Sequence, residues 1–291
     1  MARHFLNLAD LSTGEIRALI NRAAALRRDP LTDTLSGRTL ALLFSKPSTR
    51  TRIALEAGMA QLGGQALYLG RDSLQLGRGE SISDTARVMS SMVDAVAIRT
   101  HAHAEIAEFA AHSDAPVINA LSERAHPCQL LADLMTWQER CGAADFDAPV
   151  AWIGDGNNVC NSWLEASSMF GFELRVACPE GFEPDAERLR AAGASIVRDV
   201  GEAVRGAAVV NTDTWVSMGD DPARAAAFAG YQVTAELLDQ AAEGVILLHC
   251  LPAYRGSEVD ETVLDDARSA VWQQAENRLH THKALLELLL R

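Results

Sequence analysis

Residues 39–69 read TLALLFSKPSTRTRIALEAGMAQLGGQALYL, and this stretch decides the fold. The apolar runs at 39–44 and 65–69 have the length and composition of buried strands, and the segment 48–62 between them is typical of an amphipathic helix. Neighbouring parallel strands need a crossover connection, which is usually a helix. The stretch therefore predicts an α/β fold built around a parallel sheet.

The same alternation of apolar strands and amphipathic helices continues along the rest of the chain. We expect further strands at 95–99, 116–119, 150–153, 173–177, 195–197, 207–211 and 245–248. We expect further helices at 14–26, 81–92, 104–112, 128–140, 161–170, 185–192, 222–228, 234–241 and 274–290. The pattern predicts parallel sheets that are flanked by helices.

The chain length indicates two domains. A chain of 291 residues exceeds one small domain and suits two domains of about 130–150 residues each. The segment CGAADFDAP, which begins at Cys141, separates the two alternating series and is typical of a linker. We therefore expect the boundary near residues 140–147.

The composition excludes several classes of function. The net charge of −13 argues against a nucleic acid or an anionic membrane as partner. No apolar run reaches the ~18–20 residues that a membrane span needs, and the first residues lack the apolar stretch of a signal peptide. We expect a cytoplasmic protein. Lys46 and Lys283 are the only lysines, so an anion would be bound chiefly by arginine, whose planar fork suits phosphate and carboxylate.

The five cysteines do not indicate a disulfide framework or a zinc site. Their number is odd, their spacing is wide, and no CxxC motif is present. We expect most of them to be small core residues.

The segment Ser45-Lys46-Pro47-Ser48-Thr49-Arg50-Thr51-Arg52 follows a predicted strand and opens a predicted helix. A helix N-terminus offers free N–H groups and a favourable dipole, which together with hydroxyls and an arginine bind phosphate. The alternative is an ordinary helix that Ser48 caps and whose arginines are solvated. The segment is not a Walker A loop, because the GxxxxGK[ST] spacing is absent.

Two further motifs follow predicted strands of the first half. Arg99 ends the strand at 95–99, and the carboxyl ends of parallel strands are where ligands bind. His126, with Pro127, Cys128 and Gln129, precedes a helix, and the imidazole could donate a hydrogen bond to an oxygen that gains charge in a transition state. Each motif by itself is also compatible with a structural role.

The segment Gly154-Asp155-Gly156-Asn157-Asn158 resembles half of a dinucleotide-binding fingerprint. The third glycine of GxGxxG is missing, while Glu180 lies roughly twenty residues on, where a ribose-binding acid is expected. This fragment supports a rival interpretation as a nicotinamide-dependent dehydrogenase, which predicts that the protein binds NADH.

Three motifs in the second half could act on a substrate. Asp213-Thr214-Trp215-Val216-Ser217-Met218-Gly219 follows a strand, and its carboxylate, hydroxyl and glycine turn could hold an amino acid's ammonium group. His249 and Cys250 suggest nucleophilic catalysis, but neighbouring residues of a strand point to opposite faces and cannot easily form a dyad. Glu276-Asn277-Arg278-Leu279 opens the last helix.

The order and spacing of these motifs resemble the carbamoyltransferase family over nearly the whole chain. The set that carries the resemblance is STRTR, GRGES-x-x-DTARV, Arg99, HPCQ, GDGNN, DTWVSMG, HCLP and AENR. DTWVSMG and HCLP are similar to the ornithine branch in particular. The loop SLQLGRG at 73–79 has no lysine, whereas the corresponding loop of the aspartate branch carries one. Acetylornithine enzymes usually differ from this sequence at the STRT motif, and putrescine enzymes lack the SMG motif.

The resemblance implies a carbamoyl phosphate-binding domain at 1–142, which the C-terminal helix at 274–291 rejoins, and an ornithine-binding domain at 143–273. It implies that carbamoyl phosphate is bound by Ser48, Thr49, Arg50, Thr51, Gln75, Arg99, His126, Pro127, Cys128, Gln129, Cys250, Leu251 and Arg278. It implies that ornithine is bound by Asn158, Asp213, Ser217 and Met218. The residues that take part in catalysis would be Arg99, His126, Asp213 and Cys250.

The resemblance further implies that no metal or organic cofactor is required, and that Gln75 reaches the site of a neighbouring subunit in a homotrimer. The expected reaction moves the carbamoyl group of carbamoyl phosphate to the side-chain amine of L-ornithine and gives L-citrulline and phosphate. A third alternative is a non-enzymatic binding subunit with the same fold. That alternative predicts erosion at Arg50, His126, Asp213 or Cys250, all of which are present.

Overall fold

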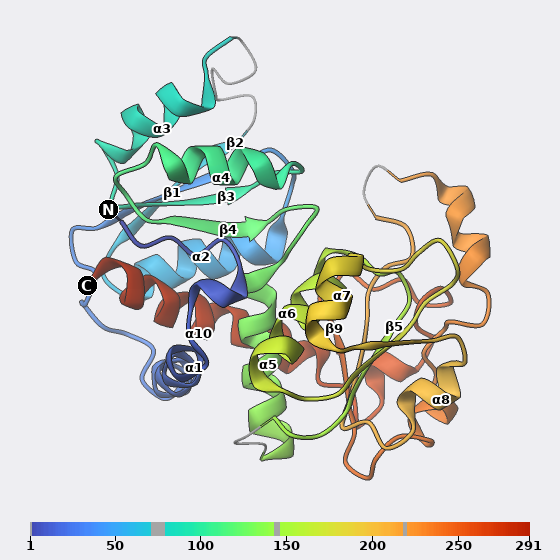
Figure 1. The fold of residues 1–291 in the computed structure, drawn as a ribbon. Coiled ribbons are helices and arrows are strands. Elements are labelled where there is room, and N and C mark those ends of the chain that lie inside the picture. The colour runs from blue at the N-terminus through green and yellow to red at the C-terminus, as the bar shows by residue number, and fades with distance from the viewer. Residues whose placement is uncertain (1, 71–78, 143–145, 218–219) are drawn as a thin grey trace. The chain divides into compact units, whose positions relative to one another are not determined.

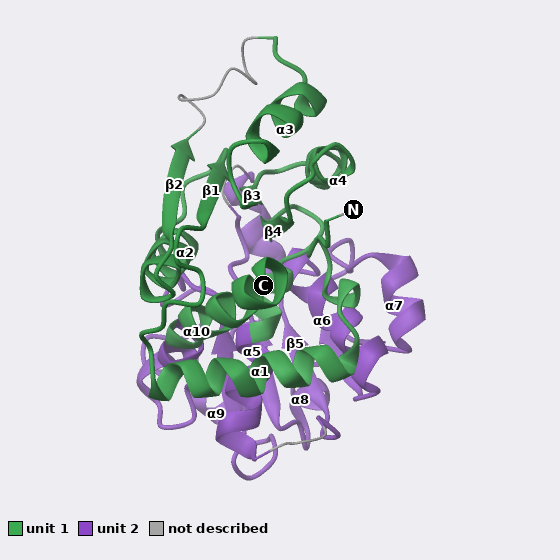
Figure 2. Cartoon of the chain, turned by 90° about the vertical axis from the view of Figure 1, so that its left-hand side faces the viewer, with its two compact units in different colours: residues 1–131, 276–291 green, residues 132–275 purple. Residues whose placement is uncertain are grey.

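The computed structural model describes residues 2–70, 79–142, 146–217 and 220–291. The chain divides into two compact units, which are coloured separately in Figure 2: Met1–Leu131 with Glu276–Arg291, and Ala132–Ala275. The division falls inside two helices, α5 (Pro127–Cys141) and α10 (Val271–Leu290). No helix within the described residues is long and apolar enough to cross a bilayer.

The first unit contains a four-stranded parallel sheet in the order β2-β1-β3-β4. Its elements before α5 are η1 (Leu8–Asp10), α1 (Thr13–Arg28), β1 (Thr39–Phe44), α2 (Thr49–Gln61), β2 (Gln65–Gly70), α3 (Ile82–Ser90), β3 (Ala95–Arg99), α4 (His103–Ala111) and β4 (Val117–Leu121). The strand–helix–strand unit predicted at 39–69 is confirmed.

Helices cover both faces of this sheet (Figure 1). Ala41, Leu43 and Val96 point to the face on which α3 and α4 lie, and they form one core with Ile106 and Phe109 of α4. The alternate strand residues, such as Leu40 and Leu42, are equally buried on the opposite face. Both faces are apolar, as expected for a parallel sheet between helices.

The C-terminal part of α10 packs against α1 and α2. A Cβ atom at Gly58 of α2 would lie 3.3 Å from Cγ of Lys283, so glycine permits the close approach of the two helices. The buried Lys283 Nζ donates to the carbonyl oxygens of Leu26 and Pro30, at 3.1 and 3.0 Å, and to Oε1 of Gln61 at 2.7 Å. The expected return of the C-terminal helix to the first domain is confirmed.

The second unit contains a five-stranded parallel sheet in the order β7-β6-β5-β8-β9. Its elements are β5 (Val150–Ile153), α6 (Asn158–Phe170), β6 (Leu174–Ala177), α7 (Ala186–Ala192), β7 (Ser195–Val197), α8 (Val200–Val204), β8 (Val209–Thr212), η4 (Pro222–Phe228), α9 (Ala235–Leu238), β9 (Ile246–His249) and η5 (Val263–Asp265). The sequence did not predict α8, because its five residues are too few to display a helical period.

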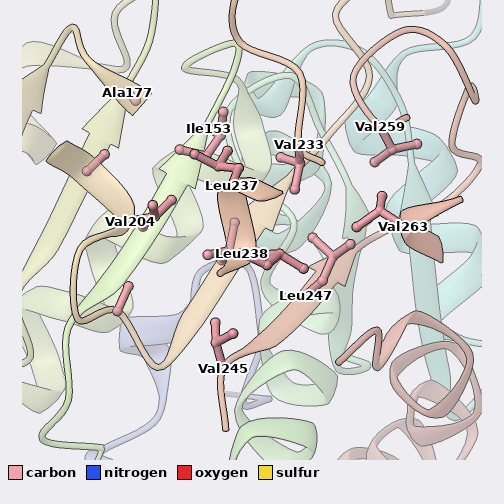
Figure 3. Packing of buried hydrophobic residues seen from close by; sticks show 14 of the residues in the cluster. Ile153, Ala177, Val204, Val233, Leu237, Leu238, Val245, Leu247, Val259 and Val263 are labelled. Carbon is pink, nitrogen blue, oxygen red and sulfur yellow. The ribbon is translucent and has the colours of Figure 1, made fainter. Parts of the chain in front are cut away.

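The core of the second unit joins β5, β8 and β9 to α8 and α9. Figure 3 shows Ile153, Val204, Leu237 and Leu247 converging in this cluster. The predicted fold class, two parallel sheets each flanked by helices, is confirmed. Since all nine strands of the two sheets are parallel, their carboxyl ends form one edge in each sheet, where loops carry the polar motifs.

Candidate functional site

The loop from β1 to α2 forms the first part of the candidate site. Ser48 occupies the N-cap of α2 with extended backbone, and its side chain accepts no hydrogen bond from the described N–H groups of the first turn. Ser48 thus stands at the predicted N-cap position, but its hydroxyl makes no capping hydrogen bond within the described residues. The amide N–H of Ser45 donates to the carbonyl of Arg99 at 2.9 Å, which fixes the loop to the end of β3. The start of α2 is a place where the helix dipole and the first-turn N–H groups favour an anion.

Arginine and threonine side chains meet at this helix start. Nη2 of Arg278, from α10, donates to Oγ1 of the buried Thr51 at 2.5 Å. The segment AENR near the start of the last helix thus contributes a guanidinium to the first turn of α2, which lies more than two hundred residues earlier in the chain. Arg278 itself is 3% exposed, so its charge acts in a medium of low dielectric constant.

His126 lies among four basic side chains. Burial is the main cause that lowers its pKa well below the usual range, followed by the electrostatic effects of the nearby Arg278, Arg99, His282 and Arg50. The imidazole is therefore neutral at pH 7, and one ring nitrogen carries a proton that it can donate without bringing a further positive charge. The predicted Arg50, Arg99, His126 and Arg278 are all close enough to interact in the first unit.

The remaining predicted residues of the first unit lie at the start of α5. Pro127 is its first residue, and the N–H of the buried Gln129 donates to the carbonyl of His126 at 3.0 Å. Sγ of Cys128 donates to the carbonyl of Asn119 at 3.4 Å, and burial raises the pKa of this thiol to about 12. Cys128 is hence a core thiol rather than a nucleophile. Gln75 lies outside the described residues.

In the second unit, Asp213 is the centre of a hydrogen-bonded group. It follows β8, and its Oδ2 accepts from Nδ2 of Asn157 at 2.7 Å. Its Oδ1 accepts from the N–H of Thr214 at 2.8 Å and faces Sγ of Cys250 at 3.1 Å. Asp213 is buried, with 8% of the residue exposed, and a carboxylate held in this way is suited to accept charge-assisted hydrogen bonds from an ammonium group.

A second buried carboxylate, Glu258, supports the loop after β9, and sequence analysis missed it. Nδ1 of His249 accepts from the N–H of Leu251 at 2.9 Å, so Nε2 carries the proton of the neutral ring and faces Oε1 of Glu258 at 3.2 Å. The same oxygen accepts from the N–H of Tyr254 at 2.6 Å. Only burial distinguishes Glu258 from surface acids, and no local motif reveals it.

The neighbouring residues His249 and Cys250 contact different partners. Cys250 faces Asp213, whereas His249 contacts Leu251 and Glu258, which agrees with the expectation that they do not form a dyad. Ligand atoms of Asp213, His249 and Cys250 lie within 4.8 Å of one another. Both ring nitrogens of His249 are already engaged, so a metal ion would have to break one of these hydrogen bonds.

The Gly154–Asn158 turn is not open to a dinucleotide. A Cβ atom at Gly156 would lie 2.2 Å from the backbone nitrogen of Pro184, so the space beside this glycine is filled by the chain itself. Oδ1 of Asn157 accepts from the N–H groups of Val159 and Cys160 at 2.9 and 3.2 Å and caps α6. The groups that would hold a pyrophosphate are thereby occupied. This geometry argues against the dehydrogenase interpretation.

The other predicted residues of the second unit lie at the start of α6 and in the loops after β8 and β9. Asn158 is the first residue of α6, and Leu251 adopts a φ of +59° next to Cys250. The N–H of Ser217 donates to Oδ2 of Asp220 at 3.0 Å. Met218 lies outside the described residues. The second unit thus brings Asp213 and Cys250 together and places Asn158 next to the residue that binds Asp213.

The fold and the two groups of residues define a class of protein: two parallel α/β units, of which one carries a cationic site suited to a phosphate and the other an acidic site suited to an amine. Two family models match this chain. Residues 3–139 match the carbamoyl-P binding domain, and residues 147–289 the Asp/Orn binding domain, of aspartate/ornithine carbamoyltransferase. The chain belongs to the aspartate/ornithine carbamoyltransferase family.

Individual relatives extend this finding. The anabolic ornithine carbamoyltransferase of Pseudomonas aeruginosa is 56% identical over 99% of this chain and 97% of its own, and the ornithine carbamoyltransferase of Chromohalobacter salexigens is 53% identical over the same shares. The crystal structure of ornithine carbamoyltransferase from Thermus thermophilus matches with a TM-score of 0.93 and 42% identity over 100% of both chains.

Proposed function

We propose that this protein transfers the carbamoyl group of carbamoyl phosphate to the side-chain amine of L-ornithine, giving L-citrulline and phosphate. The observation that carries the proposal is the group of basic residues around the neutral His126, beside a helix start that lacks a side-chain cap. Membership of the family and relatives that are named ornithine carbamoyltransferase support it.

The first domain, residues 1–142 joined by the C-terminal helix at 274–291, would bind carbamoyl phosphate. Arg50, Arg278 and the N-terminus of α2 offer positive charge and N–H donors to the phosphate group. Arg99, His126 and Gln129 would surround the carbamoyl group. The full set for this ligand is Ser48, Thr49, Arg50, Thr51, Gln75, Arg99, His126, Pro127, Cys128, Gln129, Cys250, Leu251 and Arg278.

The second domain, residues 143–273, would bind ornithine through Asn158, Asp213, Ser217 and Met218. A carboxylate that is largely buried and fixed by Asn157 offers an ammonium group a charged partner in a defined place. The thiol of Cys250, 3.1 Å from the same carboxylate, would lie beside the reacting amine. The parallel with the named relatives supports ornithine over aspartate as acceptor.

The chemistry is acyl transfer without a covalent enzyme intermediate. The neutral amine of ornithine attacks the carbamoyl carbon, a tetrahedral species forms, and the C–O bond to phosphate breaks as inorganic phosphate leaves. A neutral His126 and the guanidinium of Arg99 would donate to the carbonyl oxygen as it gains charge. The amine must first lose a proton, because amines of this kind have a pKa of ~10.4. Asp213 and Cys250 are both placed to accept or orient that proton.

Assembly and cellular role are part of the same proposal. We expect a cytoplasmic homotrimer in which Gln75 completes the site of a neighbouring subunit. We also expect a role in arginine biosynthesis, since the Pseudomonas aeruginosa relative is named anabolic.

A product assay tests the proposal. Purified protein is mixed with carbamoyl phosphate and, in parallel, with L-ornithine, L-aspartate, putrescine or N-acetylornithine, and the carbamoylated product is measured. Citrulline from ornithine alone is the expected result. Product from another acceptor alone would contradict ornithine as the acceptor. No product from any acceptor, together with tight binding of carbamoyl phosphate, would favour a non-enzymatic binding subunit. A fluorescence titration with NADH, which should give no saturable signal, tests the dehydrogenase alternative.

A further inference from the structure

A partly buried ion-pair group of Arg224, Asp155 and Asp220 lies near Asp213 and plays no part in the reaction above. Nη2 of Arg224, in η4, donates to Oδ2 of Asp155 at 2.8 Å, and Nη1 donates to Oδ2 of Asp220 at 2.5 Å. The side chains of Arg224 and Asp155 are only 23% and 14% exposed. Withdrawing charges from water costs free energy, so such a group suggests a role in fixing a particular arrangement.

Asp155 is the rigid end of this group. It follows β5 directly, and its carbonyl accepts from Nε1 of the buried Trp152 at 2.9 Å. The N–H of the preceding Gly154 donates to the carbonyl of Ala177 in β6 at 2.8 Å. The position of the Asp155 carboxylate is therefore set by the sheet of the second unit.

Arg224 links the Asp155 carboxylate to the segment 213–217 through Asp220. Asp220, which Arg224 holds, accepts from the N–H of Ser217 through the same Oδ2 atom at 3.0 Å. At the other end of the segment, Asp213 is held by Asn157 at 2.7 Å. Asn157 and Asp155 belong to one turn, so a single turn after β5 anchors both ends of the segment.

The middle of the segment is held by ring stacking. The rings of Trp215 and Phe228 are stacked, with centroids 5.8 Å apart and planes at 12°. Phe228 also packs edge-on against Phe182, and the guanidinium of Arg224 lies 5.1 Å from the Phe182 ring centroid. The helical turn η4 therefore contacts the segment through both its arginine and its phenylalanine.

We propose that Arg224 is a positioning residue for ornithine: through Asp155 and Asp220 it holds the segment 213–217 in the conformation that binds the amino acid. The inference rests on the proposed function, since it concerns the same substrate. Arg224 does not have to touch the substrate. Arg224 would order the segment before ornithine binds, so less conformational entropy would be lost on binding.

The ion pair between Asp155 and Arg224 requires that the Asp155 carboxyl is ionised. Burial is the main cause that raises the pKa of Asp155 to about 6, the nearby Asp213 and Asp220 raise it further, and Arg224 opposes them. The thiols of Cys160 and Cys178 also face this carboxylate, and burial raises the pKa of both. As the pH falls through about 6, Asp155 takes up a proton, the ion pair with Arg224 is lost, and affinity for the amino acid should fall.

Kinetics of Arg224→Gln test the inference. We expect the KM for ornithine to rise about tenfold to hundredfold, which is the effect of losing one charge-assisted hydrogen bond. The KM for carbamoyl phosphate should stay unchanged and kcat should change by less than about threefold, because the reacting groups are untouched. Arg224→Lys, which keeps the charge but loses the fork, should restore part of the affinity.

Arg175→Gln is the matched control. Arg175 lies in the same unit, has a side chain 19% exposed and forms a bidentate pair with Glu173, yet it takes no part in the site. Its loss should leave the ornithine KM unchanged. An unchanged ornithine KM in Arg224→Gln, or an equal rise in Arg175→Gln, would overturn the inference.

Two binding readouts separate this inference from the proposed function. The affinity for L-norvaline, which is ornithine without its side-chain amine and keeps its charges between pH 5 and 7, should fall towards pH 5 in the wild type and be nearly flat in Asp155→Asn. Hydrogen exchange of the Ser217 amide should accelerate in Arg224→Gln. If the wild type makes no citrulline, the proposed function is wrong. Unchanged exchange of the Ser217 amide in Arg224→Gln would independently overturn the proposed positioning role of Arg224.

Discussion

Two helices that start at comparable places in the two units differ in how their first turn is satisfied. Both α2 and α6 follow the carboxyl end of a central parallel strand. Ser48 leaves the start of α2 without a side-chain hydrogen bond from the described first turn, whereas Asn157 closes the start of α6 with two. The open start is surrounded by arginines, and the closed start holds a carboxylate. In the proposed function, the same architecture would supply an anion site in one unit and a cation site in the other.

The largest expected effect comes from removing a charge at the open start. Arg278→Gln should lower kcat/KM by ~10²–10³, because the variant loses a buried donor to the developing charge. The hydrogen bond to Thr51 is also lost or weakened. Steady-state kinetics with carbamoyl phosphate as the varied substrate measure the effect. A loss of kcat/KM below tenfold would contradict the proposed role of Arg278 at the start of α2.

The next effect concerns the turn before the closed start. Gly156→Ala should destabilise the protein by about 1–3 kcal/mol or more, since its Cβ atom would lie 2.2 Å from the Pro184 nitrogen and backbone must move. Gly14→Ala is the control, because nothing lies within 4 Å of that position and alanine is the better helix former there. Thermal unfolding should show opposite shifts for the two variants, and equal shifts would contradict the steric argument.

A smaller effect tests the charge state of the cationic unit. Burial is the main cause that lowers the pKa of His282 to about 3, and Arg278 lowers it further. The unfolded chain binds a proton near pH 6.5, so stability is lost as the pH falls below that value. Between pH 7.5 and 5.5 the wild type should lose about 1.4 kcal/mol that His282→Leu does not lose. Urea unfolding at both pH values measures the difference, and identical losses would exclude a buried neutral His282.

The smallest effect compares the two caps directly. Asn157→Ala should lower the free energy of unfolding by about 1 kcal/mol, which is typical of a lost N-cap. Ser48→Ala should change it by less than about 0.5 kcal/mol, because its hydroxyl takes no part in capping, although carbamoyl phosphate should bind more weakly. Equal losses of stability would indicate that α2 is capped in solution.

The sequence by itself determined the architecture and most candidate residues. Apolar runs of strand length that alternate with helices specify parallel sheets, since such strands must be buried on both faces. The loops after these strands then carry the polar motifs, as at Arg99, His126 and Asp213. Short elements such as α8 escaped prediction, because five residues carry no period.

Only the tertiary structure decided which distant residues cooperate. Arg278 meets Thr51, Cys250 meets Asp213, and Arg224 meets Asp155, although tens to hundreds of residues separate the members of each pair. It also showed, for the described residues, that the Ser48 side chain makes no capping hydrogen bond and that Gly156 faces the chain itself. The physical reason is that a motif records residue types and local spacing, whereas burial, pKa and hydrogen-bond partners depend on which segments the fold packs against it.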